Sequence, residues 1–436
     1  MHIAKKIGEK MSELKKLALM GGTPSVNEKF PKWPQITDED VREVVSTLQT
    51  YNLSAYEVID GPLFDFELEL REQFHVKYAL LVGSGTAALQ SAAFAIDLKP
   101  GDEIIVPTIT FPGTASVFLY TGASVKFVDV DKYTGNPTFD QIKEAIGEKT
   151  KAVVVAHAWG ISAEVDVMKK YLSEKNIVLI EDSARALGSQ CNSIPVGTIG
   201  DIGCFSFHEL KMVPAGEGGV FLTNNREYYE RAVALGHYFR SKEKYHISTT
   251  NMARYQDSSL GLNLKIHPLA ASLARSQFSR LDSRISNMKI NYEKFEGFIQ
   301  NSQMFEPLRI PKWANRISHY GFNFLRKCDN DMSISLNTLI VALRAEGISA
   351  TKIGNPPLFQ MNLFKDSVKK GPLLGKVCGS INHEDFPESI LHANLLCRLP
   401  NIYEIDYKWC NYYICALEKI ENNIELLYKW ETQNRR

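Results

Sequence analysis

Two segments of the chain combine a reactive side chain with a position at which strands normally end. Lys211 lies between a β-type run and the Gly-rich turn 216–219, and Asp182 follows the apolar run 177–180. A lysine amine can attack a carbonyl group when its ammonium form is desolvated or lies beside other charges. An acid at the end of a strand could bind a cation, a metal ion or a protonated ring nitrogen. Each residue also has an ordinary interpretation, as a solvated surface lysine and as a carboxylate that caps the following helix.

A third segment could bind an anion. Ser84, Gly85 and Thr86 come after the apolar run 79–82 and before a stretch of helical composition. The first turn of a helix exposes unpaired N–H groups and a partial positive charge, and the two hydroxyls add further donors. The segment is therefore a candidate phosphate cradle, although Ser and Thr are also common helix caps.

A sheet of the α/β class would position these segments. From about residue 77 to 225, short β-type runs alternate with helical ones, and runs such as VVVAH and IVLI are continuous, as in strands that are buried on both faces. We therefore predict a central, mostly parallel sheet that is covered by helices. The runs DIGCFSFH and GGVFLTNN follow each other without a full helix between them and would finish this sheet. In the strand that ends at Asp182, alternation places Glu181 on the opposite face.

After residue 225 the pattern becomes helical. The stretch 268–299 indicates one long helix or a bent pair. A smaller C-terminal α+β domain would contain a strand in HYGFNFLRKC, a helix that ends at Gly347 and a final helix in YKWCNYYICALEKI. A chain of 436 residues is long enough for two domains. The predicted division is an N-terminal extension (1–30), a large domain (31–287) and a small domain (288–436).

Composition limits the partners. Fifty Lys and Arg residues balance fifty Asp and Glu residues, so no long-range field favours nucleic acid or an anionic membrane. No apolar run approaches the roughly 20 residues that span a bilayer. The seven cysteines form no CxxC pair and indicate reduced thiols in a cytoplasmic protein. Neither an HExxH motif nor a carboxylate cluster at ligand spacing indicates a metal site.

Several motifs together resemble one enzyme family. SGTAAL, VPTITF, IEDSARALGS, GDIGCFSFHELK with GEGG, and GLNLKIHPLAA occur in the order and spacing of the DegT/DnrJ/StrS-type sugar aminotransferases. The similarity runs from about Phe30 to the C-terminal helix. It implies the aspartate-aminotransferase fold (fold type I) with a seven-stranded type of sheet in the large domain, and pyridoxal 5′-phosphate (PLP) as the cofactor.

The resemblance assigns roles to the candidate residues. Lys211 would bind PLP covalently and later move protons, and Asp182 would keep the pyridine nitrogen protonated, so that the ring can act as an electron sink. Phe111 would stack on the ring. Asn263, in GLNLK, would reach the phosphate of the neighbouring subunit. The other phosphate contacts would come from Ser84, Gly85, Thr86 and Ser206.

The chain departs from the family pattern at two places. Three residues after the aspartate the family usually has Gln or His, whereas this chain has Arg185. Its guanidinium could stabilise the phenolate oxygen of PLP or bind an anionic group of the substrate, such as a phosphate. The run 265–268 stands where the family commonly has Arg and then Ser-Glu, which affects any contact made there. Residues with open roles, in the pocket or in packing, are His157, Trp159, His208 and Glu217.

The resulting prediction is a transaminase. It would pass the amino group of L-glutamate or L-glutamine to PLP, and from there to a nucleotide- or phosphate-linked keto-sugar or to a ketocyclitol, in secondary-metabolite or surface-sugar biosynthesis. Lys211 would be the general acid and base, and a homodimer would share the active sites. Two alternatives stay open: a dehydratase of the same family, whose members carry His in place of Lys211, and a non-catalytic regulatory protein that kept the fold.

Overall fold

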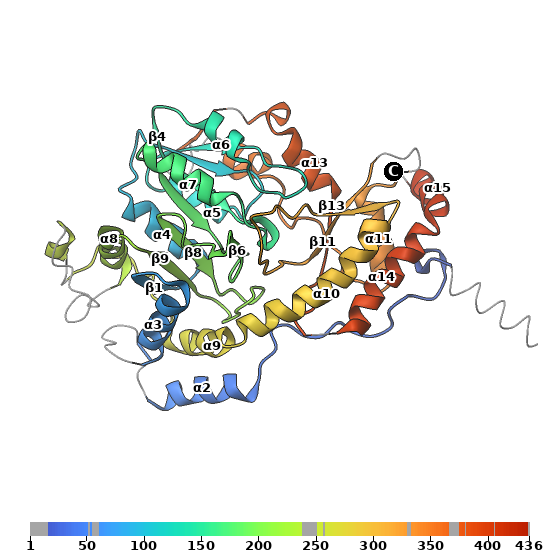
Figure 1. Cartoon of the computed structure of the whole chain (residues 1–436), viewed down its shortest axis with the longest axis horizontal. Helices are drawn as coiled ribbons and strands as arrows, with labels where there is room; N and C mark the ends of the chain where they lie inside the picture. The colour runs from blue at the N-terminus through green and yellow to red at the C-terminus, as the bar shows by residue number, and fades with distance from the viewer. Residues whose placement is uncertain are drawn as a thin grey trace, which may run out of the picture.

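The computed structural model describes residues 16–50, 53–54, 61–237, 251–255, 258–328, 333–365, 375–379, 381–404 and 406–434. Figure 1 shows a region built on a large sheet and a second region built on a small sheet, with the long helix α10 (Leu281–Asn301) running from one to the other. Among the described helices, none is long and apolar enough to cross a membrane.

The large sheet contains eight described strands. Among them, β9 alone runs in the direction opposite to the other seven. The predicted α/β class and mostly parallel sheet are thus confirmed. An eighth strand, from the C-terminal part of the chain, joins the seven of the large region. Across the sheet the order is β1 (Tyr78–Val82), β9 (Gly219–Thr223), β8 (Ile202–Ser206), β5 (Val178–Asp182), β4 (Thr150–Ala156), β2 (Glu103–Pro107), β3 (Ser124–Val128) and β12 (Val377–Cys378).

The apolar runs form strands because both faces of this sheet are covered. Val154 of β4 and Ile180 of β5 belong to one buried core. Their neighbours Val153, Val155 and Leu179 belong to another core, on the opposite face. Both sets of side chains are therefore buried, as the continuous runs predict. One core includes α4 (Gly85–Ala95), α5 (Gly113–Leu119) and α8 (Arg226–Gly236), and the other includes α6 (Phe139–Ala145) and α7 (Val165–Glu174).

Helices also cover the β1 end of the sheet. There α3 (Pro62–Phe74) and α9 (Pro268–Phe278) pack with β1 and β9, and α2 (Asp38–Gln49) lies against α9 (Figure 1). The predicted helical stretch is a bent pair, since α9 ends at Phe278 and α10 begins at Leu281. Helix α10 continues through residue 288 without a break, and the domain division at that residue stays a prediction.

The small sheet is antiparallel, and its core lies between α10, α11 and α14. The three predicted elements of this region correspond to β11, α11 and α14, and the sequence analysis missed α15. The bounds are β10 (Phe305–Pro307), β11 (Phe322–Arg326), α11 (Leu336–Ala345), α13 (Pro387–Leu395), β13 (Leu396–Leu399), α14 (Tyr407–Glu421) and α15 (Ile424–Asn434). Shorter elements are η1 (Ala18–Met20), β6 (Gln190–Cys191), β7 (Ile194–Pro195), η2 (Ala158–Gly160), η3 (Asn251–Tyr255) and η5 (His383–Asp385).

A segment between α11 and β13 returns to the large sheet. It contains η4 (Leu358–Gln360) and α12 (Asn362–Lys365), and Phe359 and Phe364 are buried in the same core as α4 and α5. Strand β12 then pairs in parallel with β3. The chain therefore crosses between the two regions more than once, and the returning segment fixes one region against the other.

Candidate active site

A cavity of ≈570 Å³ lies where strands of the large sheet end and the small sheet approaches them. Parallel strands place their carboxyl ends at one edge, which is where open α/β sheets bind ligands. With the exception of Asn263, all predicted site residues line this cavity. They are Ser84, Gly85, Thr86, Phe111, Asp182, Arg185, Ser206 and Lys211.

The start of α4 forms one wall of the cavity. Ser84 is the N-cap of this helix, since its hydroxyl accepts the Ala87 N–H at 3.1 Å, so the capping interpretation is correct and leaves the hydroxyl proton available. The turn lies close to the end of β8, because a Cβ on Gly85 would be 2.9 Å from the Cβ of Ser206. Glycine at this position therefore allows the helix start and the Ser206 hydroxyl to share one wall.

Asp182 is buried and is held in one orientation. Its Oδ2 accepts the Thr114 hydroxyl at 2.6 Å, and its Oδ1 accepts the Ala184 N–H at 3.2 Å. Because Thr114 uses its only proton on Asp182, Thr110 must be the donor in the 2.9 Å contact between the two threonines. Each carboxylate oxygen keeps a free lone pair for a ligand.

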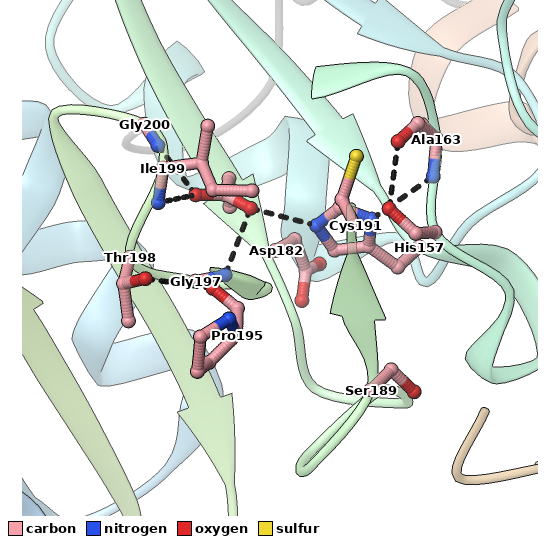
Figure 2. A network of polar contacts seen from close by, with 12 residues as sticks. His157, Ala163, Asp182, Ser189, Cys191, Pro195, Gly197, Thr198, Ile199 and Gly200 are labelled. Carbon is pink, nitrogen blue, oxygen red and sulfur yellow. Dashed lines mark hydrogen bonds and ion pairs between the residues drawn. The ribbon is translucent and has the colours of Figure 1, made fainter. Parts of the chain in front are cut away.

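Glu181 lies on the opposite side of β5, as predicted, in a buried network behind Asp182. Its carboxylate accepts four hydrogen bonds at 2.5–3.0 Å, from His157 Nε2 and from the backbone N–H groups of Gly197, Ile199 and Gly200 (Figure 2). His157 Nδ1 accepts the Ala163 N–H at 3.2 Å, so the proton is on Nε2 and the imidazole is neutral. The network ties β4 and the loop after β7 to the strand that carries Asp182, and His157 also lines the cavity.

Lys211 lies on the loop between β8 and β9, and β8 is the neighbour of β5 in the sheet. Backbone hydrogen bonds close this loop from Phe207 to Gly218 at 2.8 Å and from Glu209 to Gly216 at 3.0 Å. Gly216 has a φ of +78°, a conformation that suits glycine. The predicted Gly-rich turn therefore folds the loop so that the lysine enters the cavity.

The environment of Lys211 lowers the pKa of its ammonium group. Desolvation is the largest cause, and the neighbouring cations Arg185 and Arg398 act in the same direction, although Tyr320 and Asp182 oppose them. A lower pKa increases the fraction of unprotonated, nucleophilic amine at any given pH. Lys211 is also half-buried and lines the cavity, unlike a solvated surface lysine.

We expect this lysine to react with aldehydes at a lower pH than an ordinary lysine. Only the unprotonated amine attacks a carbonyl, so the rate of reductive methylation by formaldehyde should rise with pH and level off above an inflection that lies below 10.5, the usual lysine pKa. Peptide mass spectrometry of the cofactor-free protein over a series of pH values measures this rate. Lys289, whose side chain is 70% exposed, is the internal control, and an inflection for Lys211 at or above that of Lys289 would contradict the expectation.

Three cations surround Tyr320, a residue that the sequence analysis missed. Lys211 Nζ, Arg185 Cζ and Arg398 Cζ lie 4.8, 5.4 and 4.5 Å from the centroid of its ring. Burial alone raises the pKa of the Tyr320 phenol, but the three cations outweigh it and hold this pKa below its usual value. Tyr320 is fixed by its N–H, which donates to the Trp159 carbonyl at 2.9 Å.

The other candidates have varied positions. Phe111 lies at the cavity and is 54% exposed. His208 and Glu217 also line the cavity, and His208 Nε2 is 3.9 Å from Glu217 Oε1. Trp159 is buried and packs against Arg185, with the guanidinium 5.2 Å from its ring. Asn263 is exposed outside the cavity. In the described part of the chain, no group of three His, Cys, Asp or Glu residues is placed to hold a metal ion.

Solved structures identify the class of fold. An aminotransferase from Psychrobacter cryohalolentis matches with a TM-score of 0.79 and 24% identity, over 91% of this chain and 100% of that chain. The structure of 3-amino-5-hydroxybenzoic acid synthase matches with a TM-score of 0.77 and 24% identity, over 93% of this chain and 100% of that chain. The fold is therefore that of the fold type I PLP enzymes, as predicted.

The sequence comparison identifies the family. The chain belongs to the DegT/DnrJ/EryC1/StrS aminotransferase family, whose profile matches residues 34–384. A protein of Micromonospora echinospora, named as an L-glutamine:3-amino-2,3-dideoxy-scyllo-inosose aminotransferase, is 27% identical over 82% of this chain and 84% of its own length. The UDP-N-acetyl-3-dehydro-alpha-D-glucosamine 3-aminotransferase of Acidithiobacillus ferrooxidans is 31% identical over 68% of this chain and 76% of its own length. The predicted resemblance and the transaminase class are confirmed.

Proposed function

We propose that this protein is a PLP-dependent aminotransferase that moves an amino group from L-glutamate or L-glutamine to a keto-sugar or a ketocyclitol. The observation that carries the proposal is the convergence of Lys211, Asp182 and the start of α4 on one cavity. An amine, a carboxylate and an anion site match the carbonyl, the ring nitrogen and the phosphate of PLP. The relatives act, by their names, on both a cyclitol and a nucleotide sugar, so the acceptor class includes both.

The residues of the cavity fit the cofactor. The N–H groups at the start of α4 and the hydroxyls of Ser84, Thr86 and Ser206 would hold the phosphate. The oriented carboxylate of Asp182 would hold the protonated pyridine nitrogen, and Phe111 would lie on the ring. When bound, PLP supplies an electron sink that stabilises negative charge on a substrate carbon.

Lys211 has the properties required to bind the cofactor and to move protons. Its desolvated amine is a nucleophile for the cofactor carbonyl, and its lowered pKa provides unprotonated amine for general base catalysis. When a substrate amine displaces it, the ammonium form would rest on the ring of Tyr320, 4.8 Å away. One movable amine can thus serve both halves of the reaction.

Arg185 keeps the two roles that the sequence suggested. It lies three residues after Asp182, with its guanidinium carbon 5.2 Å from the centroid of the Trp159 ring and 5.4 Å from that of Tyr320. From there it would stabilise the phenolate oxygen of PLP or bind an anionic group of the substrate. We assign it to the cofactor, because it lies in the same cavity as Asp182, which would hold the ring nitrogen.

We further propose a cytoplasmic homodimer with shared active sites. The seven cysteines are free thiols, which suits a reducing compartment. Helix α2 and the segment that leads into it expose Ile36, Val41, Val45 and Leu48, an apolar surface that a second subunit would cover. Asn263 is exposed outside its own cavity, where it would be free to contact the phosphate in the partner site.

Subunit mixing tests the shared site. We expect Asn263→Ala to weaken cofactor binding and Lys211→Ala to be inactive, while a refolded equal mixture of the two recovers about a quarter of wild-type activity. The recovery follows because half of the dimers would be hybrids, and each hybrid would contain one site with both residues intact. Turnover of the mixture against each variant alone is the measurement. Activity of the mixture equal to the average of the two variants would contradict the sharing.

A dehydratase is the second candidate, because the fold alone does not separate the two reactions. The structure of a GDP-4-keto-6-deoxymannose-3-dehydratase matches with a TM-score of 0.77 at 22% identity. The dehydratase branch of the resembled family carries His at the position of Lys211. The amine at this position therefore favours transamination over dehydration.

The test separates the two half-reactions. The purified protein is loaded with PLP and treated with glutamate or glutamine, and the absorption spectrum is followed for conversion to the pyridoxamine form. Keto-sugars, keto-sugar phosphates and ketocyclitols are then screened for reversal of this change, with mass analysis of the product. An aminated product supports the proposal. A dehydrated product, or PLP binding without any amine transfer, would replace it with one of the alternatives.

A further inference from the structure

Arg284 is a buried arginine that the proposed chemistry does not use. It lies near the start of α10, and it is 2% exposed. Burial lowers the pKa of its guanidinium group to about 10, and within the described residues no carboxylate lies within 4.0 Å of it. A buried cation without a carboxylate is unfavourable. What the fold gains in return is a set of hydrogen bonds that an apolar side chain could not make.

One of these hydrogen bonds reaches the loop that carries Lys211. Arg284 Nη1 donates to the carbonyl of Met212, the residue after the lysine, at 2.9 Å. The backbone hydrogen bonds of the loop close its base, but among the described residues Arg284 alone donates a hydrogen bond to residues 209–215 from another element. Met212 is also buried in the same core as Ile285 of α10. The guanidinium therefore fixes the backbone from which the lysine side chain extends.

Gln277 orients this guanidinium. Its Oε1 accepts a hydrogen bond from Arg284 Nη2 at 2.5 Å, and its Nε2 donates to Asp40 Oδ2 at 2.9 Å and to the Gln35 carbonyl at 3.1 Å. Only this orientation of the amide satisfies both neighbours, because a guanidinium can only donate and a carboxylate can only accept. Asp40 is buried in α2 and pairs with Arg280 at 2.8 Å. The partner of Arg284 is therefore itself fixed at both ends.

Aromatic side chains also contact Arg284. Its Cζ lies 5.0 Å from the centroid of the Trp33 ring, and Trp33 stacks on Tyr403 at 3.6 Å. Tyr403, Met212 and Lys211 line a cavity of only ≈10 Å³. Closely packed interiors transmit a displacement instead of absorbing it, so we expect a change at Arg284 to move the lysine.

We propose that Arg284 is a positioning residue for Lys211, which it holds in the cavity through the carbonyl of Met212. The inference rests on the proposed function, because it takes Lys211 as the lysine that binds the cofactor. Arg284 is not among the described residues that line the active-site cavity, so it acts on the reaction only through the loop. Displacing a reacting group by about 1 Å can lower a rate roughly 100-fold.

The full chain with Arg284→Met tests the positioning without turnover. Methionine is unbranched and uncharged, so it fills much of the same space but leaves the Met212 carbonyl without its donor. Amide hydrogen exchange over residues 207–218 should become roughly 10-fold faster, with the strand 178–182 unchanged. The inflection for reductive methylation of Lys211, measured without cofactor, should move up toward 10.5, because a looser loop exposes the amine to water. Peptide mass spectrometry measures both.

Two further variants separate position from charge and from stability. Arg284→Lys keeps the charge and one donor, so it should show smaller changes of the same sign, and it decides the question alone if Arg284→Met does not fold. Arg275→Met removes an arginine of α9 that pairs with Glu69 at 2.7 Å. This control should lower the temperature of unfolding and leave the Lys211 inflection and the exchange over 207–218 unchanged. If the Arg284 variants changed neither readout, or if Arg275→Met changed both as much, the proposal would be overturned and Arg284 would have a structural role alone.

Turnover of the holoenzyme gives an independent readout. Arg284→Met should lower kcat of the glutamate half-reaction roughly 10- to 100-fold, with a much smaller change in KM, because Arg284 contacts no substrate. A raised KM with an unchanged kcat would contradict the positioning role. Absence of amine transfer in the wild type, with the loop and the Lys211 inflection still dependent on Arg284, would instead count against the aminotransferase and leave the positioning supported.

Discussion

Replacing Lys211 by alanine is expected to reduce transamination about 10⁴-fold or more while the protein still folds. The substitution removes the nucleophile for the cofactor carbonyl and the group that moves protons, and each of these contributions is large. Lys211 is on a loop rather than in the core of the sheet, so little packing is lost. The measurements are the visible absorption band of lysine-bound PLP, which should disappear, and turnover with glutamate and a reactive ketone.

A matched control distinguishes chemistry from general disturbance. Lys289→Ala makes the same change at an exposed position of α10 and should leave both the band and the turnover unchanged. Thermal unfolding of both variants should match the wild type within a few degrees. If Lys211→Ala retained the band or turned over at a rate near that of the wild type, the assignment of the cofactor lysine would be wrong.

The change Asp182→Asn is expected to lower the rate of the glutamate half-reaction roughly 10²- to 10³-fold, which is typical for removing one aligned electrostatic contact from an active site. Asparagine has almost the same shape, and its amide oxygen can still accept the hydrogen bond that Thr114 donates to Oδ2 at 2.6 Å. It lacks the negative charge that would keep the pyridine nitrogen protonated, and its amide nitrogen replaces Oδ1, so it also loses the weaker 3.2 Å hydrogen bond from the Ala184 N–H. The shape of the cavity should therefore be kept, while the effect of the Asp182 charge on the cofactor is lost.

Rescue by a modified cofactor makes this expectation specific. PLP that is methylated on the ring nitrogen carries a permanent positive charge, so it should recover a large part of the lost rate in Asp182→Asn and none in Lys211→Ala. Asp282→Asn, at an exposed residue of α10, is the control. Equal loss with both cofactors would indicate a positioning role for Asp182 instead of an electrostatic one.

The sequence could predict the part of the site that one sheet carries. Asp182 and the turn at Ser84 follow separate parallel strands, and parallel strands bring their carboxyl ends to a common edge. Lys211 follows β8, which is the neighbour of β5, so its closeness to Asp182 also depends on strand order alone. The opposite placement of Glu181 follows from alternation along one strand.

Tyr320 and Arg398 depend on how the second sheet docks, and no local pattern encodes that arrangement. The run Leu396–Leu399 reads as a strand in which one charged residue separates buried apolar neighbours, a signal that was available in the sequence. Whether this charge faces solvent or a cavity follows only from the packing of β13 beside β11 and the loop at Gly321. Strand β12 was missed for a related reason, since its two residues form a strand only through pairing with β3.

The returning segment also determines how substrates can enter. If the two regions opened about a single hinge, β12 would have to separate from β3. Phe359 and Phe364 would also have to leave the core of the large region. These contacts oppose a hinge movement between the two regions, so we expect substrates to be selected mainly by the existing shape of the cavity.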